Sequence, residues 1–361
     1  MTKRIVGGSV FGLGLFVLLA AFALAFLVAP LLTRIPYDTK PAEIATVASN
    51  ATFVQARVSG QTTSIDVGTA NLRARTSVQP DVAAAAGIGG AQAGRTVVWK
   101  TFERVERTDT GEAIDASESR IALDRTSGAA APWGGQCLAD EPYEKCTAGN
   151  VTYAGQLYQF PFGTQKRTYQ YYDRQLGHAL PIQYRGTDTV EGVSAYRFEQ
   201  VVPEQPLATS AATIRTLTSR FAPGASTARV MYHTRRTVWV EPVSGVIVSV
   251  VDQPHRTLVP DTGPPTVLFD ATFRFSPQTL HSVTQSAASG RVRILILNRY
   301  APIGLALLGI AGLLAGYRIT RGAPPTTRRP PAVVVPAQAV PAHVTGPAAT
   351  HPAESASYRE P

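Results

Sequence analysis

Residues 5–33 read IVGGSVFGLGLFVLLAAFALAFLVAPLLT, and this uncharged run decides how the rest of the chain is organised. A helix of about 20 apolar residues crosses the roughly 30 Å hydrocarbon core of a bilayer, so the run is long enough to span it. Ala23 and Ala25 also fit the Ala-x-Ala cleavage site of a signal peptide, whose apolar region is only about 7–15 residues long. Because the run is much longer than that, we expect residues 5–33 to form an uncleaved transmembrane helix.

A second apolar stretch, residues 301–317, reads APIGLALLGIAGLLAGY. Tyr300 and Tyr317 flank it and arginines follow it, as is typical of the aromatic belt and the cytoplasmic end of a membrane span. Its length lies at the lower limit of about 17 residues, and a buried core helix is the alternative. We predict a second transmembrane helix over residues 300–317, because a Pro- and Arg-bearing tail follows it rather than more of a folded domain.

The charges at the membrane flanks indicate which side of the membrane each segment occupies. Lys3 and Arg4 precede the first span. The second span is followed by Arg318, Arg321, Arg328 and Arg329, and it is preceded on its other side by a smaller group, Arg291, Arg293 and Arg299. The positive-inside rule therefore predicts a double-pass protein of the plasma membrane. Residues 1–4 and 318–361 are expected in the cytoplasm, and residues 34–299 outside it.

The two cysteines of the chain, Cys137 and Cys146, support this orientation. Eight residues separate them, and in an oxidising compartment such a pair closes a small loop whose disulfide contributes about 2–4 kcal/mol to stability. A zinc site would need two more soft ligands nearby. We therefore predict a disulfide between these cysteines and no metal site.

The region between the spans reads mainly as β-structure. Short segments rich in β-branched and aromatic residues alternate with Gly, Pro, Asp and Asn, which is the pattern of strands and turns. Residues 239–250, WVEPVSGVIVSV, are typical of a hairpin. Residues 207–221 have the apolar spacing of a helix, and residues 83–94 are typical of a flexible loop. The predicted fold class is a membrane-anchored α+β protein, mainly β, with a disordered Pro- and Ala-rich tail at residues 318–361.

Two parts of this region share a pattern of residues. The segments WKTFERV at 99–105 and YRFEQV at 196–201 both contain Phe-Glu-x-Val. Each is followed by an apolar strand that ends in an acid and a Ser-Gly turn, IALDRTSG at 121–128 and VWVEPVSG at 238–245. The repetition suggests two related β-units, and a chance similarity between strand sequences is the alternative.

The most aromatic stretch, residues 160–186, is the part of the chain that first suggests a binding site. Strand alternation predicts an aromatic hairpin with a turn at residues 163–166, in which Tyr158, Phe160 and Phe162 share one face of the first strand and Tyr169 and Tyr171 share one face of the second. The candidate aromatic wall consists of Tyr158, Phe160, Phe162, Tyr169, Tyr171 and Tyr172. Tyr172 and Arg174 are expected on the face opposite Tyr169 and Tyr171. The wall is either a protein core or the lining of a ligand cavity, with Gln170, Asp173 or Arg174 as partners of the tyrosine hydroxyls.

The sequence carries no recognisable set of catalytic or cofactor-binding residues. None of the six histidines lies at metal-ligand spacing, and the glycines of residues 87–94 do not fit a dinucleotide loop. Asp173 and His178 are the best candidates for a catalytic pair, but no positioned nucleophile accompanies them. We therefore predict a non-enzymatic protein without a cofactor.

The formal charge of +9 does not indicate a nucleic-acid partner. Between Arg34 and Arg299 there are 27 basic and 23 acidic residues, so the difference is only +4. The rest of the excess lies at the membrane flanks and in the tail. No basic stripe or recognition motif is present, and nucleic-acid binding is rejected.

The segment YQFPFGTQKRTYQYYDRQLGHALPIQYRGTDTVEGVSAYRFE, with the later WVEPVSGVIV, resembles the PorA-like family of actinobacterial membrane proteins of unknown function. The resemblance includes both apolar spans and covers nearly the whole chain apart from the tail. A porin, however, needs a closed barrel with an apolar outer band or oligomerised amphipathic helices. Two apolar helices around a polar domain do not supply either, so the family name alone is not interpreted as a pore assignment.

These observations lead to one leading hypothesis and two alternatives. The leading hypothesis is a cell-envelope protein whose outer domain binds a lipid, an envelope glycolipid or a partner that carries one, because concave apolar pockets hold such ligands. The first alternative is a structural or assembly protein that docks other envelope proteins. The second is a hydrolase acting on envelope material.

Overall fold

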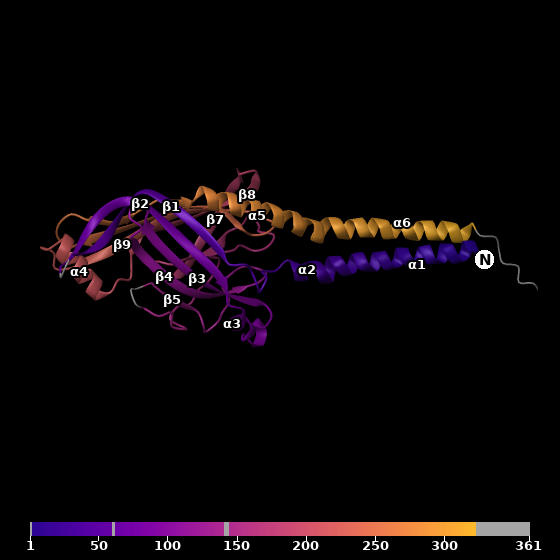
Figure 1. Ribbon diagram of the computed structural model, residues 1–361, viewed down its shortest axis with the longest axis horizontal. Helices are drawn as coiled ribbons and strands as arrows, with labels where there is room; N and C mark the ends of the chain where they lie inside the picture. Colours follow the sequence, from indigo (N-terminus) through magenta and orange to yellow (C-terminus); the bar gives the residue numbers. More distant parts are fainter. Residues whose placement is uncertain (1, 60–61, 141–143, 323–361) are drawn as a thin grey trace, which may run out of the picture.

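The computed structural model describes residues 2–59, 62–140 and 144–322. Figure 1 shows an elongated molecule with a β-rich domain at one end and two long helices side by side at the other. The predicted fold class is confirmed, because a mainly β domain is flanked by N- and C-terminal apolar helices. Most of the predicted disordered tail, residues 323–361, lies outside the described residues.

Each long helix contains a short π-helical stretch. The first consists of α1 (Thr2–Ala23), η1 (Leu24–Val28) and α2 (Ala29–Leu32), and the second of α5 (Pro277–Leu295), η3 (Ile296–Tyr300) and α6 (Ala301–Arg321). Two stretches, Lys3–Leu31 and Pro277–Arg321, are long and apolar enough to cross a membrane.

The second helix starts at Pro277, well before the predicted start of the span at residue 300, so the end of the predicted β-rich region, residues 34–299, contains α5. The reason is a local start signal. Ser276 Oγ accepts a hydrogen bond from Thr279 N at 3.2 Å, and Pro277 occupies the first turn, where its missing N–H costs nothing.

Helices α1 and α6 pack against each other through glycines. A Cβ atom on Gly14 would lie 2.6 Å from Leu313 N and 2.8 Å from Gly309 O, closer than side chains approach. A Cβ on Gly316 would lie 2.5 Å from Phe11 N. Small residues at such positions let two membrane helices come into backbone contact, which is how apolar helices associate without a hydrophobic driving force.

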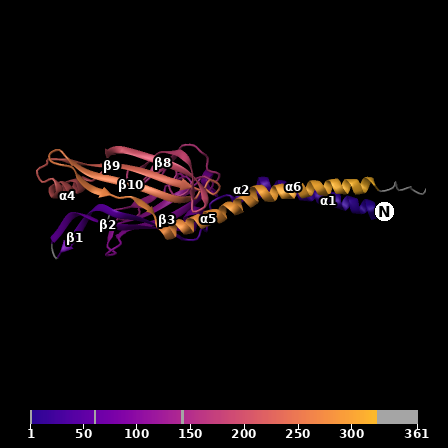
Figure 2. The ribbon, with the colours of Figure 1, turned by 90° about the horizontal axis from the view of Figure 1, so that it is seen from above.

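The β-domain is one long sheet that folds into two layers. Its strands are β1 (Ala42–Ser59), β2 (Thr62–Pro80), β3 (Thr96–Arg107), β4 (Ala113–Asp124), β5 (Cys137–Ala139), β6 (Tyr169–Asp173), β7 (His178–Val190), β8 (Val193–Pro206), β9 (Ala228–Val240), β10 (Ile247–Pro260), β11 (Thr266–Asp270) and β12 (Phe273–Phe275). Their order is β5-β4-β3-β2-β1-β11-β10-β9-β8-β7-β6, and β12 pairs with β1 and β10. Figure 2 shows β8, β9 and β10 in one layer and β1, β2 and β3 in the facing layer.

The hydrophobic core lies between these layers because the strands bury alternate residues. In β9, for example, Val230, Tyr232 and Thr234 are buried while their neighbours are at least partly exposed. Such alternation is the sequence signature of a strand with one face in a core. The predicted hairpin at residues 239–250 is confirmed as the β9–β10 turn, where Glu241 N donates to Val246 O at 2.9 Å.

Three short helices complete the described part of the domain: α3 (Val82–Ala86), η2 (Gly90–Gln92) and α4 (Ala211–Phe221). Helix α4 lies at the end of the domain farthest from α1 and α6 (Figure 1) and corresponds to the predicted helix, with Ser210 as its N-cap. The predicted flexible loop at residues 83–94 instead contains α3 and η2. Asp81 starts α3 by accepting a hydrogen bond from Ala84 N at 3.0 Å.

Candidate functional site

The predicted aromatic hairpin is only partly correct. Strand β6 exists, but it pairs with β7 in the register Tyr169↔Ile182, and residues 158–162 lie outside the named strands. The preceding segment instead crosses to the β9–β10 turn, where Phe160 N donates to Gly245 O at 2.9 Å. Pro161 has no backbone N–H to donate to a neighbouring strand, which explains why this alternating sequence does not form a strand.

The six residues of the candidate aromatic wall are divided between two core clusters. Phe160, Tyr169 and Tyr171 pack with Phe198, and the ring centroids of Phe160 and Phe198 are 5.1 Å apart. Tyr169 and Tyr171 thus share a face, as predicted. The other three belong to the second cluster: Tyr172 is a member of it, and Tyr158 and Phe162 are partly buried against it.

The predicted common face of Tyr158, Phe160 and Phe162 is therefore wrong. Phe160 is fully buried and Tyr172 is 1% exposed, so both side chains are enclosed by protein. Aromatic rings at these separations contribute stability through edge and offset contacts as well as through burial.

The tyrosine hydroxyls find partners other than those expected. Tyr171 Oη donates to Leu157 O at 2.9 Å, and Gln165 N donates to Tyr169 Oη at 2.9 Å. Tyr172 Oη is buried without a hydrogen bond in the described structure. Burial raises the pKa of Tyr171 to about 12, so the phenol stays protonated and serves as a donor.

Asp173 belongs to a buried charged network. Its Oδ2 accepts from Tyr232 Oη at 3.0 Å and lies 3.5 Å from Arg236 Nη1. Arg236 Nη2 donates to Asp252 Oδ2 at 2.8 Å, and its Nη1 donates to Gln200 Oε1 at 2.9 Å. Burial opposes the charge of Arg236, but the surrounding groups, Asp252 first, raise its pKa above the usual value. Each buried charge in this network therefore has an oppositely charged or hydrogen-bonding partner, which offsets the cost of burying it.

His178, the other half of the candidate catalytic pair, is exposed. Its Nδ1 lies 3.0 Å from Leu176 O, in the turn that connects β6 to β7. Arg174 follows β6 and reaches the facing layer, where its Nη2 donates to Ser117 Oγ at 2.7 Å and its Nη1 lies 3.2 Å from Glu103 Oε2. Arg174, Ser117 and Glu103 therefore hold the two layers together. Within residues 2–59, 62–140 and 144–322, no group of three metal-ligating side chains occurs.

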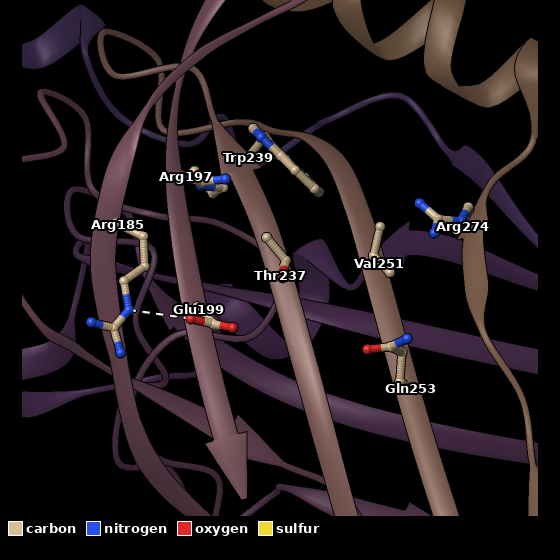
Figure 3. Close-up of a pocket in the computed structure, with 8 residues that line it drawn as sticks. All are labelled: Arg185, Arg197, Glu199, Thr237, Trp239, Val251, Gln253 and Arg274. Atoms are coloured by element: carbon tan, nitrogen blue, oxygen red, sulfur yellow. Dashed lines mark ion pairs between the residues drawn. The ribbon is translucent and has the colours of Figure 1, made fainter.

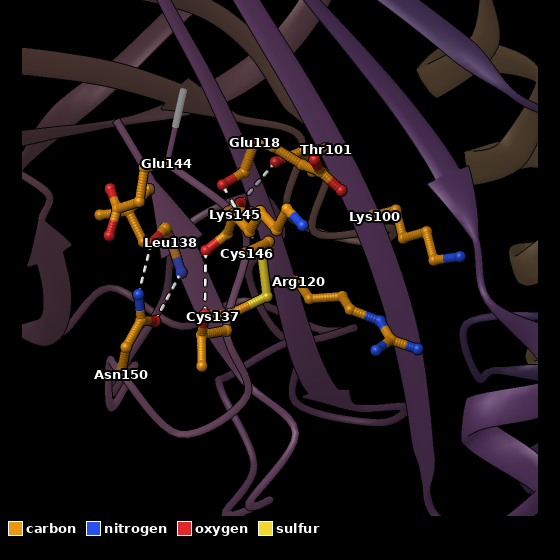
Figure 4. Close-up of a disulfide and its surroundings, with 12 residues drawn as sticks. Lys100, Thr101, Glu118, Arg120, Cys137, Leu138, Glu144, Lys145, Cys146 and Asn150 are labelled. Atoms are coloured by element: carbon orange, nitrogen blue, oxygen red, sulfur yellow. Dashed lines mark hydrogen bonds between the residues drawn. A yellow bond between two sulfur atoms is a disulfide. The ribbon is translucent and has the colours of Figure 1, made fainter. Parts of the chain in front are cut away.

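The predicted disulfide is confirmed. Cys137 on β5 and Cys146 are bonded, and Figure 4 shows the bond beside strand β4. Asn150 fixes the same segment, because its side chain accepts from Leu138 N at 2.9 Å and donates to Leu138 O at 2.6 Å. The disulfide thus ties the short edge strand β5 to the loop that contains Cys146.

An open hollow of about 460 Å³ lies on the outward face of β7 to β10 and β12, away from the core. It is lined by Arg185, Arg197, Glu199, Thr237, Trp239, Val251, Gln253 and Arg274 (Figure 3). Glu199 Oε2 lies 3.2 Å from Arg185 Nε, and the Trp239 indole N–H donates to Asp188 Oδ2 at 2.8 Å.

Sequence reasoning missed this hollow. The available signal was period-two alternation in β8 and β9, which places Arg197 and Glu199, then Thr237 and Trp239, on one face. Nothing in the sequence reveals that β8 and β9 are neighbours. The hollow draws on five strands and its arginines lie on β7, β8 and β12, so they do not form a basic stripe in the sequence.

A two-layer β-domain carried on two long apolar helices defines a membrane-associated protein. The chain belongs to the family described as Porin PorA, whose model matches residues 6–318. It is 32% identical over 108 residues to "Porin PorA" of Corynebacterium resistens and 29% identical over 191 residues to "Porin PorA" of Corynebacterium amycolatum. These matches cover 28% and 43% of this chain and 26% and 47% of the relatives, so less than half the length of either relative is matched. The predicted resemblance is confirmed.

The prediction of a lipid-binding function is wrong. The matching family and both relatives are named as porins, a name for channel-forming proteins and not for lipid-binding proteins. The structure supplies the physical reason for the error. The aromatic residues that suggested a lipid cavity are used to fill the protein core, with Phe160, Tyr171 and Tyr172 all less than a tenth exposed.

Proposed function

We propose that this protein is a non-enzymatic subunit of a porin-type assembly in the cell envelope. The observation that carries the proposal is the extent of the family match. It includes both apolar helices and the whole β-domain, residues 6–318, so the family's property belongs to the complete architecture and not to one part of it.

The packing of the helices bears on where a passage would lie. Gly14 and Gly309 bring α1 and α6 into backbone contact, which leaves no lumen between the two helices of one chain. The β-layers are filled by core side chains. A passage therefore has to form between copies of the chain. The apolar side chains on the outer faces of the helices, such as Phe16, Leu19 and Leu308, are exposed and available to lipid or to another copy.

The same proposal includes the orientation in the membrane. Residues 1–4 and 318–361 lie in the cytoplasm, and the β-domain lies outside. The basic residues at both helix flanks support this orientation by the positive-inside rule. The disulfide between Cys137 and Cys146 supports it too, because disulfides persist in oxidising compartments.

Planar-bilayer recording with the purified full-length protein tests the channel. Stepwise conductance that rises steeply with protein concentration is expected, because several copies must assemble. The variant Gly14→Leu, which separates the helix pair, is expected to lose the conductance. Gly224→Ala, at a glycine where a Cβ would meet nothing within 4 Å, is expected to keep it. Inserted, folded protein without conductance at any protein-to-lipid ratio would contradict the proposal.

Labelling in intact cells tests the orientation. A cysteine introduced at Ser219, exposed on α4, is expected to react with a membrane-impermeant maleimide without lysis. The native cysteines form a disulfide and do not react. Reaction only after lysis would place the domain on the cytoplasmic side.

A further inference from the structure

We propose that the hollow on the outward face of β7 to β10 and β12 binds a small soluble anion with two or more charged oxygens, of the phosphate or polycarboxylate type. The proposal rests on the side chains in and around this hollow. It does not depend on the proposed channel function, and its readout is binding and not conductance.

The charge balance of the hollow favours an anion. Glu199 is shared between two arginines, with Oε2 3.2 Å from Arg185 Nε and Oε1 3.3 Å from Arg235 Nη1. Arg197 Nε lies 3.6 Å from Asp188 Oδ2. Arg274 has no ion pair and no side-chain hydrogen bond within the part of the chain that the structure describes. Three arginines therefore pair with two carboxylates and Arg274 is left without one, so this face has an excess of positive charge.

Hydrogen-bonding groups in the hollow are also available. Within the described residues, the Thr237 hydroxyl and the Gln253 amide make no side-chain hydrogen bond. Thr237 on β9 is the strand partner of Glu199 on β8. Gln253 lies on β10, the next strand, where Val251 pairs with both Thr237 and Arg274 of β12. Both polar groups therefore lie between Glu199 and Arg274. Guanidinium groups bind carboxylates and phosphates through two parallel hydrogen bonds, and neutral donors beside them complete such a site.

The shape of the hollow limits the size of the ligand. Its volume of about 460 Å³ lies within the range of roughly 300–1,000 Å³ that is usual for small-molecule sites. Figure 3 shows Arg185 and Arg274 on opposite sides, with Thr237 and Val251 between them. Trp239 lies at one end, where its indole N–H is already bound to Asp188, so the ring offers a rigid apolar surface. A compact anion matches this arrangement.

The test uses the full-length protein in nanodiscs of uncharged phosphatidylcholine, titrated with inorganic phosphate and with citrate at constant ionic strength set by chloride. Calorimetry and tryptophan fluorescence report binding, and Trp239→Phe assigns the optical signal. Saturable binding of either anion is expected. Arg274→Gln and Arg197→Gln are each expected to weaken it about tenfold or more, because each removes a charge-assisted hydrogen bond.

Arg229→Gln is the matched control, because Arg229 is exposed on the same strand as Trp239 but does not line the hollow. This variant is expected to bind as the wild type does. The proposal is overturned if neither anion binds, if the two hollow variants bind as tightly as the wild type, or if Arg229→Gln weakens binding as much as they do. Binding seen only with anionic vesicles, and not with the free anions, overturns it as well.

Discussion

Asp124 and Glu241 hold two equivalent turns in the two layers of the domain. Asp124 Oδ1 accepts from Ser127 N at 2.8 Å and from Ser127 Oγ at 2.9 Å. Glu241 Oε2 accepts from Ser244 N and from Ser244 Oγ, both at 2.7 Å. In each turn the glycine after the serine has a positive φ, 67° at Gly128 and 73° at Gly245.

The segment at residues 156–163 joins these two turns. Gln156 Nε2 donates to Ser127 O at 2.9 Å, and Gln159 Nε2 donates to Ser244 O at 2.7 Å. The residues just before the aromatic stretch, together with its first residues, therefore link the two layers. A Cβ on Gly245 would collide with Phe160 O, so the glycine is needed for the close approach as well as for the turn.

Asp124→Asn is expected to lower the free energy of unfolding by about 0.5–1.5 kcal/mol at neutral pH, because an amide replaces a charged acceptor. Partial burial opposes ionisation, but hydrogen bonds from Ser127 and Thr126 hold the pKa of Asp124 below its usual value. A lowered folded-state pKa stabilises the fold above the unfolded value of about 3.9, and the contribution is lost as pH falls through the folded value. Denaturant titration of both proteins at several pH values measures this. A difference that persists unchanged at acid pH would count against the charge as its cause, and Glu112→Gln, at an exposed glutamate, serves as the control.

Arg236→Met is expected to destabilise the domain by about 3–5 kcal/mol, because it leaves the Asp173 and Asp252 carboxylates without their shared cation. The double variant Arg236→Met with Asp173→Asn is expected to recover part of this loss, since one fewer buried charge is unpaired. Chemical denaturation of the wild type, both single variants and the double variant measures the coupling. Strict additivity would show that Arg236 and Asp173 do not interact energetically.

The sequence predicted the β9–β10 hairpin, the apolar helices, helix α4 and the disulfide, because each depends on residues close together in the chain. It did not predict the sheet order, since the β1–β11 pairing that folds the sheet joins strands distant in sequence.

The repeated sequence pattern shows how far local sequence similarity predicts structural equivalence. The acid and Ser-Gly turns at Asp124 and Glu241 are equivalent, but Phe102 and Phe198 are not. The residue before the acid pairs with Val97 in the first unit (Leu123) and with Tyr196 in the second (Val240). Phe102 lies five residues after Val97, whereas Phe198 lies only two residues after Tyr196. The shared Phe-Glu-x-Val segments therefore lie at different distances from their turns.

Removing the disulfide is expected to lower the free energy of unfolding by about 2 kcal/mol, toward the lower end for disulfides because the loop is short. The effect arises from the loop and from β5, which pairs with β4 over only three residues. Cys137→Ala with Cys146→Ala is compared with the wild type by hydrogen exchange. Faster exchange is expected at the backbone amides of Cys137–Ala139, including Leu138. The exchange of the paired amides in β9 and β10 is expected to stay unchanged. Equal loss of protection throughout the domain would mean that the disulfide is required for the whole fold.

Gly14→Leu is expected to destabilise the membrane helix pair by about 1–3 kcal/mol, because a side chain at this position would overlap the backbone of α6 at Gly309 and Leu313. The matched control is Gly304→Leu, at a helical glycine where a Cβ would meet nothing within 4 Å. Both substitutions raise helix propensity by the same amount, so only the contact differs. Unfolding by sodium dodecyl sulfate, followed by circular dichroism in mixed micelles, measures the stability of each variant. If Gly304→Leu lowered stability as much as Gly14→Leu, the backbone contact between α1 and α6 would not be what holds the helices together.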